Sequence, residues 1–511
     1  MQDTAPWRIV AVLSLMVALV ACDAPDRRVR AAQAFQRGRG QEEAGQVEKA
    51  LRSYQEAIRL RPEYTDAHRR RAILLAARGE QEQLRQEYRA WLDRRPDSPV
   101  FHYLYGRLLE DPASQLAEFD RAVALDPRYY WGHYGRAYLL AKERRIEEAL
   151  AAFQAASDLG PERAKPYLFI GYLYTLQGKL DLAVASYEKA LQVNPQLPLA
   201  HRRLASLHIR RGEFPLAIEA YRSAAELDPR DAQSRFYLGN LLKARGDLDG
   251  AAAALQSAVE IQPGFADAWR NLGLIHHERG ELQRASAAYA RAAEFDPESS
   301  IIAYLLGVVR LRLQQYEAAA KSFRRVIRIE PEQGRAHFFL GEIARRRGDY
   351  PRAVAAYARA AKFVTPHPEV YYRLGRAYAA VGRYPEAASA LQRSVHLLEK
   401  APREVTEGGP DTGGGLDIDI PPPPDLAIAY TWWGRVLVGM GDLSAAEAAY
   451  RKAITHGPKL AEPQRALGEI YEGRGQVQAA VRAYRRYLEL APDGEDAEWV
   501  RQHLKGLERA R

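Results

Sequence analysis

The chain has 511 residues and a formal net charge of +9 at pH 7. That excess is modest for the length, so the composition does not indicate a nucleic-acid-binding tail, and we expect no nucleic-acid partner. Cys22 is the only cysteine, which excludes an internal disulfide and a cysteine-based zinc cluster.

Residues 1–21 are expected to be a lipoprotein signal peptide rather than part of the fold. Arg8 precedes an apolar run of twelve residues, Ile9–Val20, which suits a secretory signal and is too short to span a bilayer comfortably. The run ends in Leu19-Val20-Ala21-Cys22, which resembles a bacterial lipobox. The resemblance implies cleavage before Cys22 and attachment of the lipid to that cysteine. The alternative is an ordinary signal peptide with a cysteine near its end by chance.

Residues 22–30 are expected to be a short tether. Asp23 follows Cys22, and an aspartate at this place resembles the signal that keeps an enteric lipoprotein in the inner membrane. Other lineages use other rules, so the outer membrane stays open as the alternative. The expected location is therefore a bacterial cell membrane, with the chain facing the periplasm.

Prolines then recur at a fixed step along most of the chain. Seven of the eight successive gaps are 34 residues and the remaining one is 31 residues. The prolines are Pro62, Pro96, Pro127, Pro161, Pro195, Pro229, Pro263, Pro297 and Pro331. Self-similarity at such a period indicates stacked repeats, each of which buries its apolar face against its neighbours.

Each repeat carries the same markers when the proline is placed at position 32. Position 15 is often glycine, and large side chains fall at positions 4, 7, 11 and 24. A small residue at position 8 lets two helices cross closely, and glycine at position 15 takes the positive φ of a helix end. The thirteen small residues at position 8 are Gly38, Ala72, Gly106, Ala137, Gly171, Ala205, Gly239, Gly273, Gly307, Gly341, Gly375, Gly434 and Gly468.

This pattern resembles the tetratricopeptide repeat. The resemblance implies an all-α, right-handed superhelical solenoid of about thirteen helix-turn-helix repeats with a capping helix at the C-terminal end. Eleven repeats would fill residues 31–401, two more would fill residues 427–494, and residues 495–511 would form the capping helix. The repeats are 31–64, 65–98, 99–129, 130–163, 164–197, 198–231, 232–265, 266–299, 300–333, 334–367, 368–401, 427–460 and 461–494.

Two segments depart from the pattern. The repeat 99–129 is three residues short, and the missing residues fall between its helices near Asp111. Residues 402–426 are a Gly/Pro-rich insertion in which the acidic-apolar strip Leu416–Ile420 precedes Pro421–Pro424. One interpretation is a tolerated surface insertion. The other is that the strip folds back on a basic groove or offers a strand to a partner.

The resemblance also implies a concave groove lined by positions 2, 5, 9 and 12 of the first helix in each repeat. Aromatic and arginine side chains there are candidate contacts, because both are enriched at interfaces. One cluster comes from three successive repeats and is expected to converge on one face: Tyr103, Trp131, Tyr134, Tyr138, Phe169 and Tyr172. The other candidates are Arg202, Phe236, Asn240, Arg270, Asn271, Tyr304, Phe338, Tyr372 and Arg376. The alternative is that these aromatic residues pack against adjacent helices.

Two specialised grooves known in this family are incomplete here. Asn240 and Asn271 occupy two places of the clamp that grips chaperone C-termini, but its basic places hold Phe236, Ile301 and Leu305. An asparagine ladder would need asparagine repeatedly at position 6, where only Asn271 supplies it. The run from His276 to Glu278 is interpreted as structural rather than metal-binding, because adjacent side chains diverge on a helix.

No phosphate-cradling loop, nucleophile elbow or metalloprotease motif appears in the sequence. We therefore expect neither an enzyme nor a cofactor or metal. The expected function is a non-catalytic, lipid-anchored scaffold that binds protein segments in an envelope assembly such as a pilus, secretion or polysaccharide-export machine. The alternative is a glycan-binding lipoprotein whose aromatic groove holds an exported polysaccharide or peptidoglycan.

Overall fold

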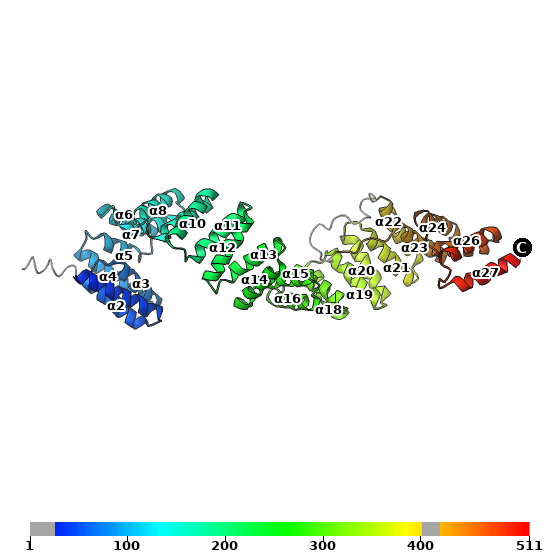
Figure 1. The fold of residues 1–511 in the computed structure, drawn as a ribbon, viewed down its shortest axis with the longest axis horizontal. Coiled ribbons are helices and arrows are strands. Elements are labelled where there is room, and N and C mark those ends of the chain that lie inside the picture. Colours follow the sequence, from blue (N-terminus) through cyan, green and yellow to red (C-terminus); the bar gives the residue numbers. More distant parts are fainter. Residues whose placement is uncertain (1–25, 401–418, 510–511) are drawn as a thin grey trace, which may run out of the picture. The chain divides into compact units, whose positions relative to one another are not determined.

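The computed structural model describes residues 26–400 and 419–509. Within these ranges every regular element is a helix and no strand occurs, as Figure 1 shows. Consecutive helices pack in pairs, which confirms the expected all-α solenoid of helix-turn-helix repeats. The chain divides into two compact units, residues 1–229 and residues 230–511. The expected signal peptide, Cys22, and residues 402–418 of the insertion lie outside the described residues.

The N-terminal unit begins with a helix over residues 26–43. The helices that follow in this unit are α2 (Val47–Leu60), α3 (Thr65–Ala77), α4 (Gln81–Arg94), α5 (Pro99–Gly106), α6 (Pro112–Leu125), α7 (Tyr130–Lys142), α8 (Ile146–Leu159), α9 (Ala164–Leu176), α10 (Leu180–Val193), α11 (Pro198–Arg210) and α12 (Phe214–Leu227).

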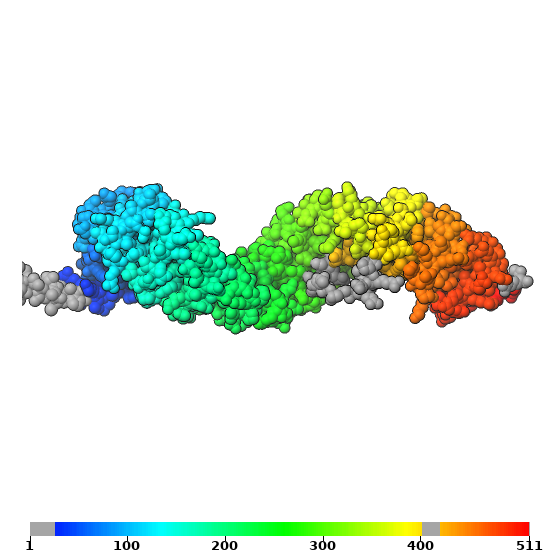
Figure 2. All heavy atoms as spheres, turned by 90° about the horizontal axis from the view of Figure 1, so that it is seen from above, coloured from blue at the N-terminus to red at the C-terminus, as the bar shows by residue number. Residues whose placement is uncertain are grey.

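The C-terminal unit continues the same alternation of helices. Its helices are α13 (Ala232–Ala244), α14 (Leu248–Ile261), α15 (Ala266–Glu278), α16 (Leu282–Phe295), α17 (Ser300–Arg312), α18 (Tyr316–Ile329), α19 (Gly334–Arg346), α20 (Tyr350–Phe363), α21 (Pro368–Ala380), α22 (Tyr384–Lys400), α23 (Leu426–Gly439), α24 (Leu443–His456), α25 (Glu462–Gly473), α26 (Val477–Leu490) and α27 (Ala497–Arg509). In Figure 2 the colours change in chain order along each unit, because the helices of a repeat pack mainly on each other and on the neighbouring repeats.

The first described helix begins inside the segment that was expected to be a tether. Asp26 lies in its first turn and pairs with Arg30 one turn later, at 3.2 Å. A carboxylate near a helix N-terminus and an i,i+4 ion pair both favour helical structure. Residues 26–30 therefore belong to this helix and not to a tether.

The small residue at position 8 lies where the two helices of a repeat cross. A Cβ atom on Gly273 would lie 2.6 Å from ring atoms of Tyr289, and one on Gly171 would lie 3.0 Å from Tyr187. Such distances leave no room for a side chain unless the facing ring moves. The sequence-based prediction that glycine permits this close crossing is confirmed.

Position 15 ends the first helix with a left-handed residue in twelve repeats. Ten of these residues are glycines, with φ between 71° and 85°, such as Gly280. Arg144 and Gln314 hold the same position in two other repeats and keep the conformation, with φ of 59° and 58°. The expected role of position 15 is therefore confirmed, and the repeat imposes this backbone even where glycine is missing.

A hydrogen bond that the sequence analysis did not anticipate joins successive repeats. The ring N–H at position 4 donates to the carbonyl oxygen of the preceding proline, six residues earlier. The pairs are His68–Pro62, His102–Pro96, His133–Pro127, His201–Pro195, Trp269–Pro263 and His337–Pro331, with distances between 2.8 and 3.1 Å. Because a carbonyl oxygen only accepts, Nε2 of each histidine must carry the proton.

The short repeat 99–129 loses its residues at the end of its first helix. Helix α5 has 8 residues, whereas α7 and α9 each have 13. Asp111 then starts α6 by accepting a hydrogen bond from the Ser114 amide at 2.8 Å. The shortening thus lies before α6, as the sequence indicated, but it is taken from the first helix rather than from the link between the two helices.

The C-terminal helix α27 packs on α26 through buried Ala497 and Val500. The exposed face carries the polar residues Glu498, Gln502, Lys505 and Arg509, as expected for a helix that ends a stack. Across residues 26–400 and 419–509, no helix has the length and apolar character needed to cross a membrane.

Candidate binding surfaces

The aromatic cluster of the N-terminal unit is assembled as its sequence pattern indicated. Tyr103 of α5 contacts Trp131 of α7, and their ring centroids are 5.9 Å apart. Trp131 contacts Tyr134 at 5.6 Å, and Tyr134 contacts Phe169 of α9 at 6.1 Å. Burial raises the pKa of Tyr134 to about 12. The cluster therefore links the first helices of three successive repeats.

Much of this cluster is interior rather than surface. Tyr103 and Trp131 are 2% and 7% exposed, and Tyr134 and Phe169 are half-buried. Tyr103 and Trp131 therefore pack against adjacent helices and are not exposed for direct contact with a partner. These rings support a surface but do not form it.

Two arginines lie against the buried tryptophan. The guanidinium of Arg69 is 3.4 Å from the ring centroid of Trp131, and that of Arg163 is 4.9 Å from it. Asp66 lies 3.4 Å from Arg69 and 3.9 Å from Arg163. Such cation–π contacts strengthen when they are shielded from water. The sequence analysis did not select Arg69 as a site residue, although an arginine at groove position 5 was the available signal.

The exposed layer above these rings is a row of side chains at position 9, here called the position-9 row: Ile73, Arg107, Tyr138 and Tyr172. Tyr138 is 53% exposed and Tyr172 is 41% exposed. Tyr138 meets Phe169 edge-on, with centroids 5.7 Å apart, and the Arg203 guanidinium is 5.9 Å from the Tyr172 ring. Exposed aromatic rings held on a packed base, with cations beside them, form a surface suited to binding a partner.

In the C-terminal unit the candidate asparagines bind each other. The Asn271 side-chain amide donates to Oδ1 of Asn240 at 2.7 Å, and Arg270 Nε donates to Asn271 Oδ1 at 3.2 Å. Arg270 also pairs with Asp267 at 2.8 Å. Phe236 packs on Phe265, with centroids 4.7 Å apart. These contacts are internal to the unit and do not complete a carboxylate clamp.

The remaining candidates differ in exposure. Phe338 is fully buried and Tyr372 is 5% exposed, so neither is available to a partner in this conformation. Tyr304 is half-buried and packs edge-on against Phe339. Position 5 carries aromatic residues here because they fill space between neighbouring first helices, which is the alternative interpretation of the pattern. Arg202 of α11, in the N-terminal unit, is half-buried.

Arg376 lies on an aromatic ring that the sequence analysis did not select. Its guanidinium is 4.2 Å from the ring centroid of Trp432, and that of Arg435 is 4.3 Å from the same ring. Trp432 is half-buried on α23, the first helix after the insertion. Cation–π contacts at Trp432 therefore connect the repeat before the insertion, which holds Arg376, with the repeat after it, which holds Trp432 and Arg435.

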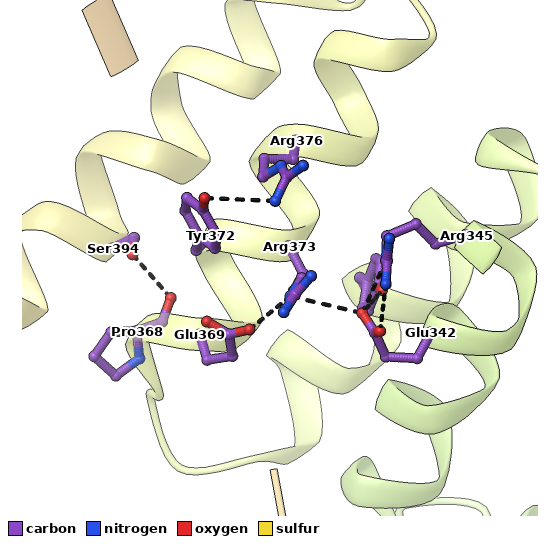
Figure 3. Close-up of polar contacts among 9 residues, drawn as sticks. Glu342, Arg345, Pro368, Glu369, Tyr372, Arg373, Arg376 and Ser394 are labelled. Atoms are coloured by element: carbon purple, nitrogen blue, oxygen red, sulfur yellow. Dashed lines mark hydrogen bonds and ion pairs between the residues drawn. The ribbon is translucent and has the colours of Figure 1, made fainter. Parts of the chain in front are cut away.

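A buried ionic network joins α19, α20 and α21, and Figure 3 labels its charged members on α19 and α21. Glu342 accepts hydrogen bonds from Arg345 at 2.9 Å and from the Tyr357 hydroxyl. Arg373 lies 3.6 Å from Glu342 and donates to Glu369 at 2.6 Å. The sequence analysis missed this network, because its members are scattered over three helices and form no motif.

Burial and the two arginines act in opposite directions on these carboxyl groups. Burial tends to raise the pKa of Glu342, but the hydrogen bonds from Arg345 and Tyr357 and the charge of Arg373 outweigh it, so the pKa lies below its usual value. Burial raises the pKa of Glu369, which Arg373 only partly offsets. The charges are satisfied within the unit, so the network stabilises three helices rather than forming an open site.

Two histidines at position 11 make the same structural contact in different repeats. His276 Nδ1 lies 2.7 Å from Glu281, and His208 Nδ1 lies 2.7 Å from Glu213 at the same two positions of another repeat. A contact that recurs in register between a helix end and the following turn belongs to the repeat itself. No group of three metal-ligating side chains occurs in the part of the chain that the structure describes.

Sequence comparisons identify the family. A tetratricopeptide repeat model matches residues 35–99, 202–264, 238–300, 304–368 and 433–495, and two further models of this repeat match residues 171–212 and 370–406. The chain therefore belongs to the tetratricopeptide repeat family. Proteins of this family are generally non-catalytic scaffolds whose repeats bind protein partners. Among curated proteins, none matches the chain.

Solved structures of the same repeat align with parts or most of the chain. YrrB, a tetratricopeptide protein with an unusual peptide-binding site, is 23% identical, with 39% of this chain and 97% of YrrB covered and a TM-score of 0.33. The C-terminal part of a repeat protein from Cytophaga hutchinsonii is 16% identical; the alignment covers 52% of this chain and 98% of that protein, with a TM-score of 0.42. The Cut9–Hcn1 assembly contains a chain that is 12% identical; the alignment covers 94% of this chain and 96% of that one, with a TM-score of 0.33.

Proposed function

We propose that this protein is a non-catalytic scaffold that binds segments of other proteins through the position-9 row of its N-terminal unit. The observation that carries the proposal is the exposure of Tyr138 and Tyr172 one repeat apart, on a base of packed aromatic rings. An exposed tyrosine offers a large rigid ring and a hydroxyl at little cost in side-chain entropy.

The neighbouring charges define the kind of segment that fits. Arg107 and Arg203 are both exposed, and Arg203 lies beside Tyr172. A segment that presents apolar side chains to the rings and carboxylates to these arginines would satisfy both. The preferred partner is therefore an extended or helical protein segment with mixed acidic and apolar residues.

We further propose that the protein is anchored by a lipid on Cys22 and works in a bacterial envelope assembly, such as a pilus, secretion or polysaccharide-export machine. The support is the apolar run Ile9–Val20, whose last two residues form the lipobox-like sequence Leu19-Val20-Ala21-Cys22 with the two residues that follow. Asp23 favours the inner membrane over the outer one. The assembly itself is proposed by analogy with other repeat lipoproteins.

A binding experiment with exposed residues tests the proposed surface. The full chain and the double variant Y138A/Y172A are used to capture proteins from envelope extracts. We expect the variant to lose captured partners by about tenfold or more, as for central aromatic contact residues. Tyr134 is left intact because it is half-buried and supports the fold.

The control is Y350A/Y384A, which removes two tyrosines of similar exposure, 38% and 37%, from the C-terminal unit. Capture should persist in this control. Equal capture by the wild type and Y138A/Y172A would contradict the proposal. Binding to an array of polysaccharides that disappears in Y138A/Y172A would instead favour the glycan-binding alternative.

The anchor has its own test. C22S should move the protein from the membrane fraction to the soluble fraction, because the lipid can no longer be attached. Lipidation of the wild-type chain should be visible as a mass increase on the peptide that begins at Cys22. An unchanged membrane fraction with C22S would contradict the proposed anchor and would leave the binding surface untouched.

A further inference from the structure

The end of the insertion rests on the C-terminal unit. Residues 419–425 lead into α23. The carboxylate of Asp419 lies 3.0 Å from the guanidinium of Arg335, near the start of α19. Ile420 is only 9% exposed and belongs to the apolar cluster that includes Ala303, Phe338 and Val370. These two residues thus contact helices that precede them by more than one repeat.

The place that they occupy is made of groove-lining positions. Arg335 stands at position 2 of its repeat, and Tyr304 and Phe338 stand at position 5 of two successive repeats. Burial raises the pKa of Tyr304, and the charge of Asp419 acts in the same direction. Tyr304 on α17 packs against the apolar cluster that contains Ile420, and Arg335 on α19 pairs with Asp419. The segment 419–420 therefore meets the first helices of these two repeats.

His367, the residue that immediately precedes α21, is near the same place. Burial lowers the pKa of His367, and the charge of Asp419 opposes this effect. The Nδ1 atom of His367 is buried and has no hydrogen-bond partner among the described residues. A buried polar atom without a partner is unusual in a folded protein, and a bound segment with a matching donor or acceptor would satisfy it.

We propose that the surface formed by Tyr304, Arg335 and His367, together with the apolar cluster that holds Ile420, is a binding site for extended acidic–apolar protein segments, and that Asp419-Ile420 is its internal ligand. The arginine pairs with a carboxylate, and the apolar cluster receives the next side chain. The site goes beyond the proposed function, since the position-9 row belongs to the N-terminal unit and takes no part.

The sequence of the internal ligand defines the chemistry of a competing partner. An acidic residue followed by a branched apolar residue matches the two contacts seen. Pro421–Pro424 follow, and proline favours an extended backbone without N–H donors. A partner segment would therefore carry Asp or Glu, then Ile, Leu or Val, and continue in an extended form.

The link to α23 explains why the internal ligand is bound. The ion pair is half-exposed, with side-chain exposures of 51% and 62%, so it adds specificity more than affinity. Burial of Ile420 supplies most of the attraction. Only residues 421–425 separate it from α23, and a short stiff link gives a local concentration in the millimolar range. A partner must compete with that concentration.

A labelled peptide with the sequence of residues 415–424 tests the site. It is titrated into the full wild-type chain and into D419K/I420S, in which the internal ligand no longer fits. In this emptied variant the added peptide no longer competes with a tethered segment. We therefore expect the variant to bind the peptide about tenfold more tightly than the wild type does. Adding R335E to the emptied variant should abolish this gain.

Three controls make the outcome decisive. R346E changes an exposed arginine at the other end of α19 and should leave peptide binding to the emptied variant intact. A peptide with Lys and Ser in place of the final Asp-Ile pair should not bind. Replacement of Pro421–Pro424 by Gly-Ser-Gly-Ser, which keeps Asp419 and Ile420, should give an intermediate affinity. Equal affinity of the wild type and a folded D419K/I420S variant, or no binding to either, would overturn the proposal.

Discussion

The indole N–H of Trp269 donates a hydrogen bond to the carbonyl oxygen of Pro263, at 2.9 Å. Five histidines make the same bond at position 4 of other repeats. The proline ends one repeat because it cannot continue a helix, and its carbonyl then receives the side chain that begins the next repeat. In these six repeats one bond thus fixes the entry of the first helix.

Trp269→Phe should weaken the start of α15. The ring remains but the N–H donor is lost, so local stability should fall by about 1 kcal/mol. Hydrogen exchange at the amides of α15 measures this, because it reports local opening in a stack that need not unfold as one unit. Trp499→Phe is the control, since its N–H has no partner among the described residues. Equal effects of the two changes would refute the role of the bond.

Backbone requirements were predictable from the sequence because they repeat and are local. Gly273 was expected at a helix crossing and Gly280 at a left-handed helix end, and both expectations are confirmed. A residue that must be small, or must take positive φ, leaves the same mark in every repeat. The bond from position 4 left a mark as well, a histidine or tryptophan six residues after proline, but its meaning required the geometry.

Gly273→Ala should destabilise the repeat that contains α15 and α16. The new methyl group would meet the Tyr289 ring at 2.6 Å, so the ring or the helix must move, at a cost of about 1–3 kcal/mol. The matched control is Gly506→Ala in α27, where no atom lies within 4 Å of the added group. That change should stabilise its helix by up to about 1 kcal/mol. Thermal unfolding followed by circular dichroism distinguishes the opposite signs.

Gln314→Gly should stabilise the protein. Gln314 has φ of 58°, which costs a residue with a Cβ atom about 1–2 kcal/mol. Glycine removes that cost but adds freedom to the unfolded chain, so a net gain of about 0.5–1 kcal/mol is expected. Gln315→Gly is the control, because Gln315 has an ordinary φ of −82°. Urea unfolding of both variants checks the difference, and a gain in the control alone would contradict it.

Side-chain exposure at the candidate sites could not be predicted from register. Tyr304 and Phe338 share position 5, yet Tyr304 is half-buried and Phe338 is fully buried. Both residues pack in or against an apolar cluster that includes Ile420, more than eighty positions away in the sequence, and register does not reveal such a neighbour. Position 9 does give an exposed row in the N-terminal unit, but Glu342 at the same position is buried. The exposure of a side chain is decided by the residues that pack around it in the folded protein, and its position in the repeat does not identify them.

Glu342→Gln should strongly destabilise the C-terminal unit at neutral pH. It would leave Arg345 and Arg373 without the carboxylate that they share, and breaking a buried ion pair costs about 3–5 kcal/mol. Because the pKa of Glu342 is lowered, this contribution is present above the ordinary pKa of glutamate and is lost as the pH falls through the lowered value. Glu386→Gln breaks the exposed pair with Arg383 and should change stability little.

The stability of the N-terminal unit should fall between pH 6.5 and pH 4 because of His68. Burial lowers the pKa of this ring to about 4, although its bond to the Pro62 carbonyl acts in the opposite direction. The unfolded chain takes up a proton near pH 6.5 while the folded chain does not, so up to about 3 kcal/mol is lost as the pH falls through this window. Hydrogen exchange at α3, referenced to the histidine-free pair α13 and α14, should show this loss. His68→Gln keeps an N–H donor but cannot titrate, so this variant should lose the pH dependence of stability between pH 6.5 and pH 4. An unchanged pH dependence in the variant would assign the effect to other groups.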